Sequence, residues 1–107
     1  MPRSIVPRSM AIVPTAHASR YLQQLCKHWS HKFDVTFDAI SGHVPLPSGN
    51  ADLAAGDMAL TVLCEVPEGG DLARLQQVVA DHLQRFAFRE GALDFRWQPA
   101  QSQPKSP

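Results

Sequence analysis

Three histidines, one cysteine and three basic residues lie within sixteen positions of this chain, and together they have the chemistry to bind a metal ion or an anion. The stretch is HASRYLQQLCKHWSHK, residues 17–32, and it contains no acidic residue. Imidazole nitrogens and thiolates are ligands for transition metals, and guanidinium groups pair with carboxylates and phosphates. Which of these side chains act together depends on the element that carries them.

The apolar residues of this stretch predict one amphipathic helix from about residue 16 to about residue 32, with Thr15 as its N-cap. Four apolar residues recur at the spacing of one helical face: Ala18, Leu22, Leu25 and Trp29. Cys26 and His28 point to different sides, since residues two apart on a helix do not face each other. This placement excludes a thiolate–imidazolium pair built from this helix alone.

One flank of the predicted helix is the candidate binding surface. It carries His17, Arg20, Tyr21, Gln24, His28 and His31. His28 and His31 are three residues apart and face each other, so they are a candidate transition-metal pair that needs further ligands. Arg20 lies in the first turn, where the helix dipole adds attraction for an anion. The alternative is that this flank is only the solvated polar edge of an ordinary helix.

His82 belongs to a second predicted helix, which begins after an Asp71 N-cap and runs to about residue 86 or 88. It falls near the centre of that helix's apolar stripe, and a buried histidine must satisfy at least one ring nitrogen. Tyr21 or a backbone carbonyl is an adequate partner. If the two helices pack side by side, His82 also meets His28 and completes a small polar pocket.

The rest of the pattern predicts an α+β fold, a two-layer sandwich in which both helices cover one face of a mostly antiparallel sheet. The sheet has four to six strands, drawn from residues 10–13, 33–37, 43–46, 51–55, 58–66 and 93–98. We expect a flexible tail over residues 1–9, a single domain over residues 10–98 and a disordered tail over residues 99–107.

Composition narrows the function classes. The 107 residues carry ten basic and ten acidic side chains, and this balance argues against a nucleic-acid partner. The first acidic residue is Asp34, so the chain begins with a basic third. Cys26 and Cys64 are expected to be reduced, buried thiols. No transmembrane run or secretory signal is evident, so we expect a cytoplasmic protein with no membrane partner.

Three blocks of sequence resemble a small bacterial family that is catalogued as a domain of unknown function. They are HASRYLQQLCKHWSHK, SGHVPLPSGNADL, and VVADHLQRFAFRE followed by DFRWQP, and the resemblance spans about residues 11–99. Members are sometimes labelled dihydroxyheptenedioate aldolase, and relatives are similar to domains associated with siderophore-interacting flavin reductases, which implies a link to iron acquisition. Aldolases of that name are (β/α)8 barrels of about 250 residues, so we do not expect that activity here.

Three functions are compatible with these observations. The leading hypothesis is a non-enzymatic binding or accessory protein for a small anionic or metal-linked ligand, with a transition-metal ion as the one possible cofactor. The second is a small enzyme that uses His28 or His31 as a general base and Arg20 to hold a substrate carboxylate. The third is a structural homodimer whose interface is the helix flank.

Overall fold

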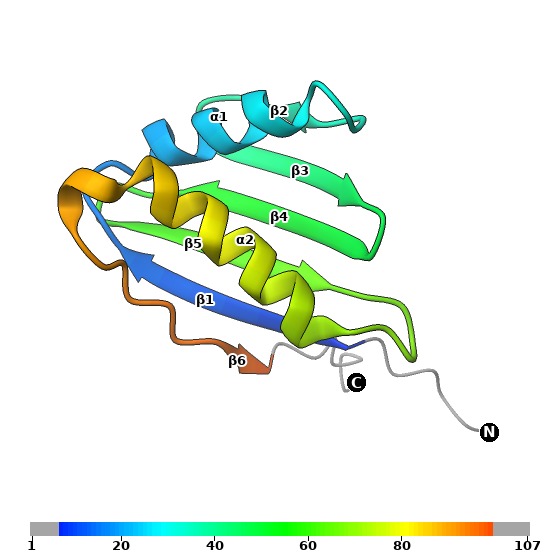
Figure 1. Ribbon diagram of the computed structural model, residues 1–107. Coiled ribbons are helices and arrows are strands. Elements are labelled where there is room, and N and C mark those ends of the chain that lie inside the picture. Colours follow the sequence, from blue (N-terminus) through cyan, green and yellow to red (C-terminus); the bar gives the residue numbers. More distant parts are fainter. Residues whose placement is uncertain (1–6, 100–107) are drawn as a thin grey trace, which may run out of the picture.

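Six antiparallel strands form one open sheet, and two helices cover one of its faces (Figure 1). The computed structural model describes residues 7–99. The strand order is β2-β3-β4-β5-β1-β6. The elements are β1 (Arg8–Pro14), α1 (Ala18–Trp29), β2 (Thr36–Phe37), β3 (Ser41–Leu46), β4 (Gly49–Ala55), β5 (Ala59–Glu65), α2 (Leu72–Phe86), the 3-10 helix η1 (Phe88–Glu90) and β6 (Gln98–Pro99). The predicted two-layer α+β architecture is confirmed.

The core lies between the sheet and the helices because alternate strand residues point to opposite faces. The strand register aligns Gly42, Leu53, Val62 and Ala11 in one continuous row across β3, β4, β5 and β1. Every member of this row is buried. The row meets the apolar stripes of α1 and α2, and each large apolar side chain buried there stabilises the fold by about 1.5–3 kcal/mol.

Gly42 allows α1 to approach the sheet closely. A Cβ at this position would lie 2.7 Å from the Sγ atom of Cys26, too close for real atoms. Cys26 is therefore directed into the sheet, on the side of α1 away from the histidines. The close approach fixes the height of α1 above β3.

The first helix is shorter than predicted, at Ala18–Trp29, and Thr15 does not cap it. The N-cap residue is His17, which makes no side-chain capping bond. Thr15 is buried, and its hydroxyl accepts a hydrogen bond from the His17 N–H and donates one to Glu90. The predicted N-cap of α2 is confirmed, since the Asp71 carboxylate accepts a hydrogen bond from the Arg74 N–H at 3.1 Å.

Two predicted strands are mostly irregular. Only Thr36–Phe37 of residues 33–37 and Gln98–Pro99 of the last segment pair with neighbouring strands. Burial does alternate along these segments, but their backbones bond elsewhere: the Leu93 N–H donates to the Gln84 side chain at 2.7 Å. At the other end of the chain β1 begins at Arg8, inside the segment predicted as a tail, and residues 1–6 and 100–107 lie outside the described part.

Candidate functional site

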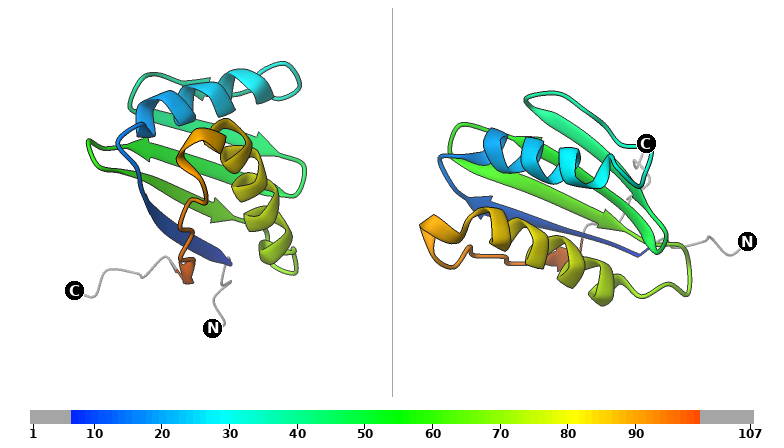
Figure 2. Two further views of the ribbon diagram at one scale, coloured as in Figure 1. Left: turned by 60° about the vertical axis from the view of Figure 1, so that its left-hand side comes forward. Right: turned by 45° about the horizontal axis from the view of Figure 1, so that its top comes forward.

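The two helices lie side by side on the sheet, and most of the predicted flank lies along the seam between them (Figure 2). We call this surface the helix seam. It consists of Arg20, Tyr21, Gln24 and His28 from α1, His82 and Phe86 from α2, and Phe88 and Arg89 from η1. The four seam residues of α1 are spaced by about one helical turn. This spacing is why the sequence alone predicts that they share one face of the helix.

An open groove of about 320 Å³ occupies one end of the helix seam. Its lining residues are Arg20, Tyr21, Gln24, Phe86, Phe88 and Arg89. Two guanidinium groups from different elements thus border the same space, and no carboxylate is among the lining residues. The Phe88 ring is 69% exposed, and the Arg89 guanidinium carbon lies 5.5 Å from its centre. The groove combines positive charge with a flat apolar wall.

A three-residue hydrogen-bond cluster holds η1 against α1 beside this groove. The hydroxyls of Tyr21 and Thr15 both donate to the same carboxylate oxygen of Glu90, the latter at 2.7 Å. These two hydrogen bonds, helped by nearby His17, lower the pKa of the Glu90 carboxyl and outweigh the opposing effect of its desolvation. Burial, followed by the bond to Glu90, raises the pKa of Tyr21. The cluster therefore contains an ionised carboxylate and a neutral phenol at neutral pH.

His28 and His82 meet at the other end of the helix seam. Their ring centres are 5.4 Å apart, with the planes inclined by 43°. The His82 Nδ1–H donates to the Val78 carbonyl at 2.8 Å, which leaves Nε2 as the free nitrogen. The Trp29 ring lies 4.8 Å from the His82 ring, and Phe86 packs edge-on against His28 at 6.1 Å. Of the two partners expected for His82, the structure contains the backbone carbonyl and not Tyr21.

The other two histidines of the flank lie apart from this pair. His17 is exposed and packs edge-on against Tyr21, with ring centres 6.1 Å apart. His31 is exposed in the turn that follows α1, because the helix ends at Trp29. The pairing of His31 with His28 stays a prediction, since the Phe33 N–H still donates to the Trp29 carbonyl, as in a helix, at 2.9 Å. Within residues 7–99, no three or more His, Cys, Asp or Glu residues are grouped so as to hold a metal ion.

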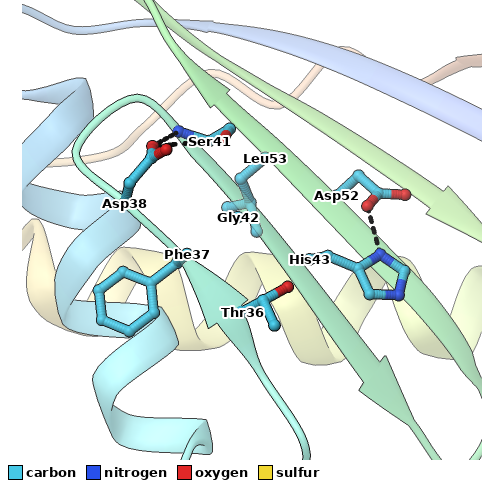
Figure 3. Close-up of a pocket in the computed structure, with 8 residues that line it drawn as sticks. All are labelled: Thr36, Phe37, Asp38, Ser41, Gly42, His43, Asp52 and Leu53. Carbon is cyan, nitrogen blue, oxygen red and sulfur yellow. Dashed lines mark hydrogen bonds and ion pairs between the residues drawn. The ribbon is translucent and has the colours of Figure 1, made fainter.

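The face of the sheet opposite the helices carries a second polar site, a hydrogen-bonded histidine and aspartate (Figure 3). His43 on β3 and Asp52 on β4 are direct cross-strand partners, and His43 Nδ1 lies 2.5 Å from an Asp52 carboxylate oxygen. Their side chains are 48% and 42% exposed. Together with Thr36 on β2 they border an open pocket of about 490 Å³, which we call the sheet pocket.

A second carboxylate in the sheet pocket, that of Asp38, is hydrogen-bonded to backbone N–H groups. Asp38 accepts hydrogen bonds from the N–H groups of Ile40 and Ser41, at 2.9 and 2.8 Å. These backbone bonds lower the pKa of its carboxyl. Asp38 therefore stabilises the turn between β2 and β3 and is a poor candidate for a proton acceptor.

Both cysteines are free and buried, as expected. Burial raises the pKa of the Cys26 thiol to about 11. Burial, with a smaller contribution from the charge of Asp52, raises the pKa of Cys64 to about 12. Since the thiolate is the nucleophile and the metal ligand, neither residue is equipped for catalysis or metal binding at neutral pH.

Residues 10–98 match the model of a bacterial family described as "Uncharacterized protein conserved in bacteria (DUF2218)". The chain belongs to this family. The match confirms the resemblance noted in the sequence, and DUF2218 carries no assigned activity in that description. The NMR structure of PA4090 from Pseudomonas aeruginosa is similar in sequence and fold, with 41% identity, coverage of 89% of this chain and 98% of that chain, and a TM-score of 0.73. None of the curated proteins compared with the chain matches it.

Within the described residues, neither helix is long and apolar enough to cross a membrane.

Proposed function

We propose that this domain binds a small anionic ligand in the groove of the helix seam, in a binding or accessory role. The observation that carries the proposal is the convergence of Arg20 and Arg89 on one groove that no carboxylate lines. The two residues belong to different elements, so their proximity is a property of the tertiary fold.

Both guanidinium groups are available to a ligand. Arg20 and Arg89 are exposed, and neither forms an ion pair with another residue in the range 7–99. Arginine presents a planar set of N–H donors that matches a carboxylate or phosphate in two-point contact. Phe86 and Phe88 add apolar walls beside these charges. A ligand that combines a carboxylate with a flat apolar part fits this combination best.

The hydrogen-bond cluster at Glu90 supports the proposal because it positions η1 before any ligand arrives. Tyr21 and Thr15 hold Glu90, and Arg89 and Phe88 are its immediate neighbours in the chain. A site whose backbone is fixed in advance loses less conformational entropy on binding. Glu90 keeps its charge, but it is not among the residues that line the groove.

Calorimetric titration tests the proposal with three probes: benzoate, inorganic phosphate and ferric citrate. Ferric citrate is included because the family resemblance implies iron acquisition. We expect benzoate or ferric citrate to bind, and Arg20→Gln and Arg89→Gln each to weaken binding by about tenfold, the effect of losing one charge-assisted hydrogen bond.

Arg74→Gln is the matched control, because Arg74 is also an exposed arginine but lies in the first turn of α2, far along the helix from the groove. It should bind like the wild type. Equal losses in all three variants would show that only overall charge matters. No heat from any of the three probes with the wild-type protein would refute the proposal.

A further inference from the structure

We infer that His28 and His82 form a two-imidazole site for a transition-metal ion at the junction of α1 and α2. The site lies at the opposite end of the helix seam from the arginine groove. The inference does not depend on the proposed anion binding, because it concerns different side chains and a different ligand.

The separation of the two rings is the first argument. Two imidazole nitrogens that share one Zn²⁺ each lie about 2.0–2.1 Å from it, and in a tetrahedral site their ring centres are then about 5 Å apart. The ring centres of His28 and His82 are 5.4 Å apart. Binding requires one side chain to turn so that a nitrogen of each ring faces the same ion. His28 is exposed and able to make that adjustment.

The anchoring of His82 is the second argument. A metal-binding histidine usually donates its other ring N–H to a carboxylate or a backbone carbonyl, which fixes the tautomer and aims the free nitrogen. His82 does this through the bond from Nδ1–H to the Val78 carbonyl at 2.8 Å. The buried Trp29 ring, 4.8 Å away, supports the same imidazole from the side. The ring is thus held with Nε2 free to act as a ligand.

The composition of the site selects the metal. Two imidazoles without a carboxylate suit Cu²⁺, Ni²⁺, Co²⁺ or Zn²⁺ and disfavour Mg²⁺ and Ca²⁺, which prefer oxygen ligands. The described residues supply no third protein ligand. Water or a small anion therefore completes the coordination from the solvent side, where His28 is exposed. We expect an exchangeable site in which Cu²⁺ binds more tightly than Ni²⁺, and Ni²⁺ more tightly than Co²⁺.

Titration of the untagged full-length chain with Cu²⁺ alone tests this site, with tryptophan fluorescence as the readout. Trp29 contacts both histidine rings, and bound Cu²⁺ should quench its emission. The other tryptophan, Trp97, packs on Phe95 near the opposite edge of the sheet. We expect His28→Gln and His82→Gln each to weaken Cu²⁺ binding by roughly tenfold or more, since each removes one of only two protein ligands.

Two variants serve as controls, His31→Gln and His43→Gln, which remove histidines from the turn after α1 and from the sheet pocket. Both should bind Cu²⁺ like the wild type. Because His28 is exposed, its variant tests the site even if His82→Gln destabilises the fold, which thermal unfolding would reveal. A loss in His31→Gln equal to that in His28→Gln, a loss confined to His43→Gln, or no quenching of the wild type would overturn the inference.

The arginine variants separate this result from the anion proposal. Arg20→Gln leaves both imidazoles in place, so its Cu²⁺ affinity should equal that of the wild type. Benzoate contains no metal, so its binding should survive His28→Gln. Each site can therefore fail its own test while the other passes.

Discussion

His82 in the helix seam and His43 in the sheet pocket are anchored in the same way, yet their surroundings differ. Each ring is hydrogen-bonded through Nδ1, His82 to the Val78 carbonyl and His43 to the Asp52 carboxylate, and each has Nε2 free. His82 is half-buried beside a second imidazole, whereas His43 lies on the open face of the sheet, and no other histidine of residues 7–99 packs against its ring. Anchoring prepares a ring for function, but the groups that surround the free nitrogen decide what that ring can do.

The first test of this comparison, with the largest expected effect, is a substitution that creates a cavity in the core beneath the helix seam. Leu83 is fully buried on α2, next to His82 in the chain. Leu83→Ala should lower the free energy of unfolding by about 2–5 kcal/mol, because it leaves a cavity in the core. Urea denaturation measures this change, and NMR should show shifts concentrated at the histidines of the seam.

Leu63→Ala is the matched control on the opposite face. Leu63 is only half-buried and is the cross-strand partner of Asp52. Leu63→Ala should lower the free energy of unfolding by less than Leu83→Ala does. It should shift the NMR resonances of His43 and not those of the histidines in the helix seam. If both substitutions disturbed both regions equally, the two sites would not be independent.

The second test uses acid to probe the cluster that positions η1. The pKa of Glu90 is lower in the folded protein than the ordinary carboxyl value, so its contribution to stability is complete above about pH 4.3. That contribution is lost as the pH falls from there through the lowered pKa, because over this range the unfolded protein binds a proton that the folded protein does not. Tyr21→Phe removes one of the two hydroxyls that donate to Glu90. It should lower the free energy of unfolding by about 1 kcal/mol at pH 7.

Urea unfolding at several pH values between 7 and 3 measures both effects. The difference in stability between the wild type and Tyr21→Phe should shrink as Glu90 becomes protonated. A difference that stays constant down to pH 3 would show that the phenol contributes through packing and not through its bond to the carboxylate.

The third and smallest test concerns the sheet pocket. Asp52→Asn keeps the size of the side chain and removes its charge. Because both partners are nearly half exposed, the substitution should lower the free energy of unfolding by only about 0–1 kcal/mol, and added salt should reduce the effect further. A loss comparable with that of Leu83→Ala would mean that the pocket stabilises the fold as strongly as the core does.

The sequence was sufficient for the parts of the fold and of the helix seam that depend on periodicity. Arg20, Gln24 and His28 are four residues apart, and the apolar stripe of α2 carries His82, so their faces follow from helical geometry alone. The length of α1 was less predictable, because Thr15 had a second possible role as the partner of a distant carboxylate. That alternative role depends on Glu90, which is 75 residues away.

The half of the groove that the sequence did not predict lies in η1. This short 3-10 helix carries no periodic pattern of apolar residues. Phe88 and Arg89 join α1 only because the chain turns back after α2. His43 and Asp52 required knowledge of the register of a hairpin, since a shift of one residue moves a side chain to the opposite face. The turn residues around Gly49 indicate that a hairpin exists, but its register depends on which side chains the helices bury.

The close approach of α1 to Gly42 makes Cys26 a natural reporter of local opening. Its buried thiol, with a pKa of about 11, meets a labelling reagent only when α1 lifts away from β3. The Cys64 side chain points from β5 to the helix-covered face, in register with Ser9, which accepts a hydrogen bond from Gln76 of α2, so it becomes reactive when α2 lifts away. The two labelling rates, read by mass spectrometry in one sample, would therefore distinguish detachment of α1 from detachment of α2, and equal rates would indicate global unfolding.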